Sequence, residues 1–266
     1  MMWAATKGAY LLTVQPDDFF PNPRREDENF GTMICFHRRY DLGDEHEYKD
    51  SDELIKDLYI NAAGGGERGE KKYEDLMEKF DVWPMTSQQI QSMNQALMSQ
   101  IKKSFVVLPV YLLDHSGLTM STTDFNDRWD SGQVGIIFVS FDKIREEMEV
   151  SRITPSIKEK AEQMLRDEVE LYDAYLRGEC YCYELYEDGE LVHSCGGFTG
   201  AFDKAVKDMI KYLPDDCAGM VNDLSETDGM PSMVQTLRNH ANILVDQAAN
   251  DHEHQPRQKV LDPLLG

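Results

Sequence analysis

The 266-residue sequence has few basic residues, few cysteines and no apolar run long enough to cross a membrane. Its 27 lysines and arginines are outnumbered by 49 aspartates and glutamates, so the formal net charge is −22. Direct binding to nucleic acid needs a basic footprint that releases counterions, and we therefore expect none. The N-terminal segment also lacks the apolar stretch and cleavage site of a secretory signal. We expect a cytoplasmic protein without a membrane partner.

Cysteine is scarce, and the motifs that hold common cofactors are incomplete. The five cysteines are Cys35, Cys180, Cys182, Cys195 and Cys217. Five cysteines cannot all pair within one chain, so they do not predict a disulfide framework, and in a reducing compartment such thiols stay free. The glycine-rich stretch 64–71 has Glu70 where a phosphate-binding loop needs lysine, and 124–132 has Arg128 and Trp129 where a calcium loop needs a ligand and a glycine. We expect no cofactor.

The acidity belongs to the whole chain and not to a tail. Every stretch of about fifty residues is net acidic, whereas a hydrophobic content of 41% and an aromatic content of 10% are typical of a folded domain. The negative charge is therefore expected on a folded surface. Such a surface attracts a partner with a basic surface, including the DNA-binding groove of another protein.

Helical and alternating patterns are interspersed along the chain. This predicts an α+β fold with a mixed or antiparallel sheet, packed helices and a C-terminal helical extension. The expected domains are an irregular N-terminal segment (1–30), an α+β core (31–213), a helical extension (214–250) and a mobile polar tail (251–266).

The stretch "CYCYELYEDGELVHSCGG" predicts a hairpin with a type I′ turn at Asp188-Gly189. Regular pairing from that turn places Glu184 opposite His193 and Cys182 opposite Cys195. One face of the hairpin then carries Cys180, Cys182, His193 and Cys195. Half-buried thiols packed under a helix explain this pattern, because Cys-x-Cys on a straight strand spreads its ligands apart. A zinc site, as in a small zinc-binding adaptor, and a redox pair are the alternatives.

An amphipathic helix is predicted over 155–177. Four carboxylates on its polar side are the candidate contact surface for a partner: Glu159, Glu162, Glu170 and Asp173. Glu168 falls on the apolar side of the same helix. It is expected to bond a tyrosine or to pair with a buried arginine such as Arg38 or Arg39, and a raised pKa that would suit an acid or base is the alternative.

Two loops rich in Ser, Thr and Asp separate the apolar strands predicted near 105–113 and 134–141. We interpret them as turns, with Asp114 accepting backbone N–H groups in the first and Asp130 capping the second. Trp129 is expected to anchor the second turn on the core. The alternative is a hydrolase or transferase whose site requires four side chains to converge: Asp114, His115, Asp130 and Cys195.

Four motifs in order, "CFHRRY", "DHSGLT", "WDSGQVG" and "SCGGFTG", occur between about residues 30 and 213. With these motifs the chain resembles a family of uncharacterised proteins carried by bacteriophages, prophages and conjugative elements. The resemblance implies an accessory or early gene of a mobile element and assigns no catalytic or binding residue.

Acidic accessory proteins of this kind resemble DNA in charge and block restriction or other anti-phage defence enzymes. Because DNA carries two phosphates per base pair, −22 corresponds to at most about eleven base pairs. We therefore expect an accessory protein that acts by binding a host or defence protein with a basic surface, either as a DNA-mimic-like inhibitor or as a binding protein of another kind.

Overall fold

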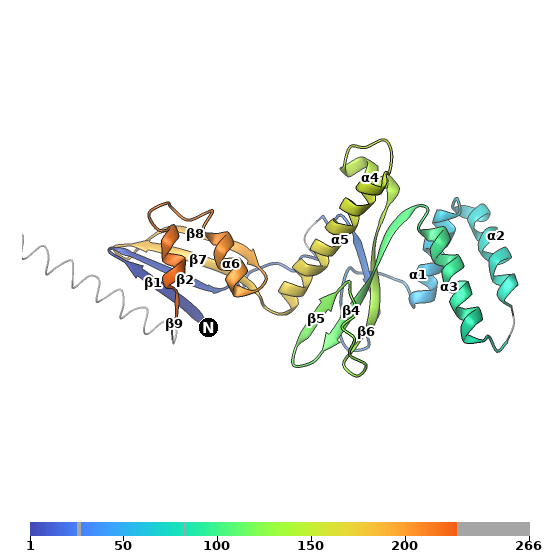
Figure 1. Ribbon diagram of the computed structural model, residues 1–266, viewed down its shortest axis with the longest axis horizontal. Helices are drawn as coiled ribbons and strands as arrows, with labels where there is room; N and C mark the ends of the chain where they lie inside the picture. The colour runs from blue at the N-terminus through green and yellow to red at the C-terminus, as the bar shows by residue number, and fades with distance from the viewer. Residues whose placement is uncertain (26–27, 82, 228–266) are drawn as a thin grey trace, which may run out of the picture. The chain divides into compact units, whose positions relative to one another are not determined.

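The computed structural model describes residues 1–25, 28–81 and 83–227. The chain divides into two compact units. One, here called the terminal unit, joins Met1–Phe20 to the chain from Glu179 onward, and the other, the central unit, is Pro21–Gly178. Both contain an antiparallel sheet, which confirms the α+β class (Figure 1). No helix in the described residues is long and apolar enough to span a membrane.

The terminal unit is a five-stranded sheet with strand order β8-β7-β2-β1-β9. Its elements are β1 (Met2–Lys7), β2 (Tyr10–Pro16), β7 (Cys180–Glu187), β8 (Glu190–Thr199), α6 (Phe202–Met209), η2 (Ala218–Asp223) and β9 (Ser225–Thr227). One core covers a face of this sheet, where α6 contacts β8, η2 contacts β1, and buried residues of β2 and β7 join them. Trp3 of β1 stacks on Phe202 of α6 with ring centroids 4.0 Å apart.

The prediction of an irregular N-terminal segment over 1–30 was wrong, because residues 2–16 form β1 and β2. Strand β2 lies in the middle of the sheet, and its residues 11–14 are all buried. A strand buried on both faces is apolar throughout and lacks the alternation that marks a half-buried strand. The core expected over 31–213 is accordingly split after Gly178, since β7 and β8 complete a sheet begun by the N-terminus.

The predicted helical extension over 214–250 is only partly described. Its first part contains the short helix η2 and then β9, which pairs with β1 at the edge of the sheet. The rest of that extension and the predicted tail 251–266 lie outside the described residues.

The central unit has a four-stranded sheet with strand order β3-β6-β4-β5. Its strands are β3 (Thr32–Cys35), β4 (Phe105–Asp114), β5 (Leu118–Ser121) and β6 (Ser131–Ser140). Its helices are α1 (Ser51–Ala62), α2 (Gly66–Met77), η1 (Glu78–Phe80), α3 (Ser87–Ile101), α4 (Phe141–Glu147) and α5 (Pro155–Leu176).

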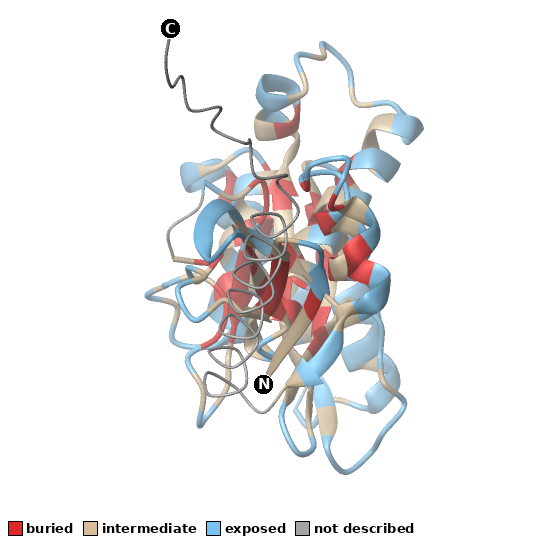
Figure 2. Ribbon diagram, turned by 90° about the vertical axis from the view of Figure 1, so that its left-hand side faces the viewer, coloured by how far each residue is buried: buried red, intermediate tan, exposed pale blue. Residues whose placement is uncertain are grey.

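Alternating strand residues bury both faces of this sheet. Met33 and Ile137 point to a core shared with α5, whereas Ile34 and Ile136 point to a second core shared with α1 and α3. Figure 1 shows α5 on one side of the sheet and α1 to α3 on the other. In Figure 2 the buried residues lie on strands and helices, whereas most loops are exposed or intermediate. The unit is therefore a sheet between two helical layers.

Glu168 of α5 is half-buried and pairs with an arginine, as the sequence predicted, but the arginine is Arg24. The Arg24 side chain is 0% exposed and also pairs with Asp44. The carboxylate of Glu168 additionally accepts the backbone N–H groups of Phe30 and Gly31. This network ties the segment before β3 to α5, and it gives the carboxylate a structural role.

Candidate functional site

Three loop segments converge at one end of the central sheet. β3 and β4 both run antiparallel to β6, so the residues after β3, the residues after β4 and the residues before β6 must meet at the same end. These segments are 36–40, 114–117 and 124–131. They contain most of the "CFHRRY" and "DHSGLT" motifs and the first three residues of "WDSGQVG".

Asp114 connects the first segment to the second. Its carboxylate forms an ion pair with Arg39 and lies 3.3 Å from the Tyr40 hydroxyl. The predicted turn at Ser116-Gly117 is present, with a positive φ at both residues and a bond from His115 N to Gly117 O. The side chain of Asp114 points to the arginine instead of capping that turn.

His115 connects the second segment to the third. Its Nδ1 lies 2.9 Å from Oδ2 of Asp130, and its side chain is 70% exposed. The backbone N–H of Asp114 donates to the Asp130 carbonyl at 2.8 Å. An imidazole paired with a carboxylate is an arrangement that can move a proton.

The third segment is organised by Asp127 and not, as predicted, by Asp130. The Asp127 carboxylate accepts the backbone N–H groups of Trp129 at 2.8 Å and Asp130 at 2.9 Å. These two bonds, Asp130 first, lower the pKa of the Asp127 carboxyl below its ordinary value. The prediction that Trp129 anchors this loop on the core was wrong, because its side chain is 93% exposed.

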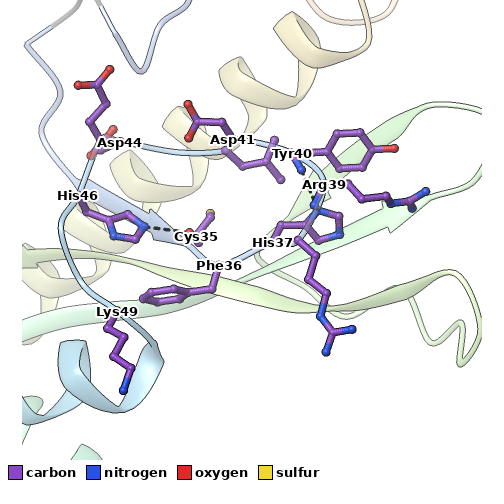
Figure 3. Close-up of a pocket in the computed structure, with 12 residues that line it drawn as sticks. Cys35, Phe36, His37, Arg39, Tyr40, Asp41, Asp44, His46 and Lys49 are labelled. Atoms are coloured by element: carbon purple, nitrogen blue, oxygen red, sulfur yellow. Dashed lines mark hydrogen bonds between the residues drawn. The ribbon is translucent and has the colours of Figure 1, made fainter.

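A pocket of about 310 Å³ opens between these segments. It is lined by His37, Arg39, Leu112, Asp114, Trp129, Asp130, Ser131, Gly132 and Val134. His37 and Arg39 also line a shallow depression of about 910 Å³ formed by residues 35–49. The two hollows therefore form one open surface. In Figure 3 His37 and Arg39 lie at one end of the larger hollow, and His46 bonds the Cys35 carbonyl at the other.

Strand β3 ends at Cys35, which leaves His37 in the loop that follows. Nδ1 of His37 accepts the backbone N–H groups of Arg39 and Tyr40, both at 3.3 Å. Nε2 of His46 donates to the Cys35 carbonyl at 3.0 Å, and its Nδ1 is buried without a hydrogen-bond partner in the described residues. Neither imidazole is hydrogen-bonded to the Cys35 thiol.

Of the four residues that the catalytic alternative requires, the structure brings together Asp114, His115 and Asp130. Cys195 lies on β8 of the terminal unit. Among the described residues that line the 310 Å³ pocket, Ser131 is the one alcohol, and its hydroxyl donates to the Asp127 carbonyl at 2.6 Å. The one hydroxyl in this lining is therefore already engaged by the backbone and not by the His115–Asp130 pair.

Burial makes the core thiols poor nucleophiles. It raises the pKa of Cys35 to about 12 and that of Cys180 to about 11. At pH 8 the thiolate fraction of Cys35 is then about one in ten thousand. We expect iodoacetamide at pH 8 to alkylate half-buried Cys195 well before Cys35, as measured by peptide mass spectrometry. All five cysteines should react in urea, and equal rates for Cys35 and Cys195 in the folded protein would contradict the burial argument.

The hairpin forms at the predicted turn, with φ of 51° at Asp188 and 88° at Gly189, but its register differs from the prediction. A bulge at Val192 shifts the pairing, so that His193 lies opposite Leu185. Cys195 then lies opposite Tyr183 and packs toward the core face.

This register separates the proposed zinc ligands. Cys182 alternates with Tyr183 along β7 and therefore faces away from Cys195, while the Tyr183 hydroxyl lies 3.0 Å from Nδ1 of His193. No group of three or more His, Cys, Asp or Glu side chains in the described part of the chain could hold a metal ion. Neither a zinc site nor a Cys182–Cys195 redox pair is assembled by this hairpin.

The four candidate carboxylates of α5 differ in exposure and in ion pairing. Glu159 and Glu170 are exposed, whereas Glu162 is half-buried and pairs with Arg166 at 3.6 Å. Asp173 is 17% exposed, accepts the Met120 backbone N–H at 2.7 Å and pairs with Arg177. The candidate contact surface predicted on this helix thus retains two freely exposed carboxylates.

The sequence indicated the two aspartates and His115 but missed Arg39 and Tyr40 as part of the same site. Their signal is the placement of "CFHRRY" directly after a strand that pairs with β6, and that pairing is a tertiary contact. No protein-family model, no curated protein and no solved structure matches the chain. The resemblance to proteins of mobile elements therefore stays a prediction.

Proposed function

We propose that this protein is an acidic accessory protein of a mobile element that binds a host or defence protein with a basic surface, as a DNA-mimic-like inhibitor does. The observation that carries this proposal is the presence of the acid excess in both structural units. The terminal unit has 18 acidic and seven basic residues and the central unit 31 and 20, so each carries −11. Both units can then contribute to attracting the same kind of partner.

A net negative charge spread over both units attracts a basic partner over distance and does not require precisely placed side chains. At physiological ionic strength electrostatic attraction extends about 8 Å from a surface, which raises the rate of encounter with a basic partner. It also repels nucleic acid, so contact with DNA would pass through the partner. Inhibition by occupation of a DNA-binding groove follows directly from such a surface.

The candidate site is better suited to binding than to catalysis. It is open, its one lining alcohol is engaged by the backbone, and an exposed tryptophan lies at its rim. Tryptophan, tyrosine and arginine are the residues that contribute most to protein interfaces. Trp129, Tyr40 and Arg39 supply all three here.

One observation favours a second candidate function, a hydrolase or transferase. The His115–Asp130 pair at 2.9 Å has the geometry of a general base with its orienting carboxylate. Because the Ser131 hydroxyl donates to the Asp127 carbonyl and Cys195 belongs to the terminal unit, such an enzyme would activate water or a hydroxyl of its substrate. The openness of the site favours the binding function over this one.

The binding proposal is tested by retaining host-cell proteins on the immobilised full chain across a salt series. We expect retention to fall steeply with salt, and a short DNA duplex to displace the retained protein, because both compete for the same basic surface. Glu159→Lys with Glu170→Lys on α5 should weaken the interaction by on the order of tenfold. Retention that neither salt nor duplex DNA changes would contradict the proposal.

A matched control separates the α5 surface from net charge alone. Glu70→Lys with Glu74→Lys changes the charge equally on α2, where both side chains are exposed. If both pairs weaken retention equally, the contact surface is not on α5, although the charge argument stands. A larger effect of the α5 pair places the contact there.

A further inference from the structure

Trp129 lies almost entirely in solvent at the tip of the loop between β5 and β6, here called the Trp129 loop (residues 124–131). Its side chain is 93% exposed. A tryptophan buries 150–250 Å² when it packs, so leaving one in water forgoes a large favourable contribution to folding. Such a residue on a loop calls for an explanation.

The exposure of Trp129 is built into the loop. The Asp127 carboxylate accepts the backbone N–H groups of Trp129 and Asp130. Ser131 Oγ donates to the Asp127 carbonyl at 2.6 Å, and Asp124 Oδ1 accepts the Asn126 N–H at 3.0 Å. These bonds hold the loop backbone with the indole directed outward. A rigid aromatic side chain loses little conformational entropy when a partner binds it.

The surroundings of the indole are acidic. The Trp129 loop contains three exposed carboxylates and one arginine: Asp124, Asp127, Asp130 and Arg128. Backbone N–H groups hold the pKa of the Asp127 carboxyl below its ordinary value, which favours its charged form. An aromatic face with carboxylates beside it attracts a cation and repels an anion.

The adjoining 310 Å³ pocket has the complementary parts. Leu112 and Val134 provide an apolar wall, and Asp114 and Asp130 provide carboxylates whose present partners are Arg39 and His115. The ion pair between Arg39 and Asp114 shows that a guanidinium is accommodated at this carboxylate. An entering side chain with an aliphatic stem and a cationic end finds a partner for each of its parts.

We propose that Trp129, together with the carboxylates of its loop, forms a binding site for a lysine or arginine side chain of the protein partner. This inference rests on the proposed function, since it assigns a specific contact to the basic surface that the acidic units attract. The indole face receives the cation, and the loop carboxylates neutralise its charge.

The test uses the full chain and a decapeptide of alternating arginine and glycine, followed through the indole N–H resonances of the three tryptophans. Matched decapeptides replace arginine with lysine or with citrulline, the uncharged isostere of arginine. Trp83, which is 94% exposed on the same unit, is the internal control. We expect the arginine and lysine peptides to shift the Trp129 resonance and leave that of Trp83 in place, and the citrulline peptide to shift neither.

The affinity of variants for the arginine peptide tests the same assignment. Trp129→Leu should weaken binding of the arginine peptide by about tenfold, while Trp83→Leu leaves it unchanged. Asp127→Ala, which removes the acceptor that orders the loop, should weaken it with Trp129 still present. Equal shifts at both tryptophans, or equal binding of the citrulline peptide, would overturn the inference.

These outcomes are distinct from failure of the proposed function. If salt and duplex DNA release a retained host protein while Trp129→Leu binds the arginine peptide as well as the unaltered chain does, the inference fails and the function stands. If the arginine peptide binds at Trp129 but retention of host proteins is insensitive to salt, the cation site stands and the proposed function fails.

Discussion

Replacing Arg24 with methionine is expected to lower the free energy of unfolding of the central unit by about 3–5 kcal/mol. The Arg24 guanidinium is 0% exposed and contacts two carboxylates, with Nε 2.7 Å from Asp44 and Nη1 2.9 Å from Glu168. Its Nη2 also donates to the Gly31 carbonyl at 2.9 Å. Methionine fills much of the space but leaves two mostly buried carboxylates without their cation. An unpaired charge of this kind destabilises the folded state because it is shielded from water.

A double substitution identifies the cause of this loss. Glu168→Gln keeps an oxygen for the N–H groups of Phe30 and Gly31 but removes the charge. In an Arg24→Met background it should cost much less than it does alone, because it removes a charge that has already lost its partner. Arg145→Met, which breaks the exposed pair with Asp142, is the control and should change stability by about 0.5 kcal/mol or less.

Because the chain has two units, the measurement must report on the central unit alone. Hydrogen exchange of α5 and β4 peptides resolved by mass spectrometry meets this need. Additive losses from Arg24→Met and Glu168→Gln would contradict the assignment of a coupled buried network.

Gly135→Ala is expected to destabilise the central unit by about 3 kcal/mol or more. A Cβ at this position would lie 2.1 Å from the Ile34 carbonyl oxygen and 2.9 Å from Cα of Cys35. Both are backbone atoms of β3, so no side chain can move aside, and β3 must separate from β6. The loop that carries Arg39 follows β3, so the contact between Arg39 and Asp114 should weaken at the same time.

Gly132→Ala on the same strand is the matched control. A Cβ there meets no atom within 4 Å, so hydrogen exchange in β6 should stay close to that of the unaltered protein. Hydrogen exchange of β3 and β6 peptides, resolved by mass spectrometry, supplies the free energies for the central unit. Equal stability of the two variants would mean that β3 does not approach β6 as closely as the structure places it.

Several elements of the fold can be predicted from the local sequence alone. Strands β4 and β6 and helix α5 follow from local pattern, since each is long and its apolar residues repeat with the period of its own structure. The turn of the β7–β8 hairpin follows from Asp188-Gly189, because few dipeptides adopt two positive φ angles. These predictions depend on neighbours within a few residues.

Other features depend on residues far apart in the chain. The place of Glu168 on the apolar side of α5 predicted that it would bind an arginine. Local sequence could not identify that arginine as Arg24, because the two residues are 144 positions apart. The bulge at Val192 inserts one extra residue into β8 and reverses the faces of His193, Ser194 and Cys195, before a second register shift follows Cys195. It therefore overturned the expected grouping of Cys182, His193 and Cys195.

Local sequence thus specified the α+β class, most long helices and strands, the hairpin turn and an acidic surface on both units, because composition and short-range periodicity carry that information. Tertiary packing specified the division into two units, the partner of Glu168 and the convergence of three loops beside Trp129. Each of these results from strand pairing or side-chain contact between distant segments, and the free energy of such pairing comes from burial that no single segment can achieve alone.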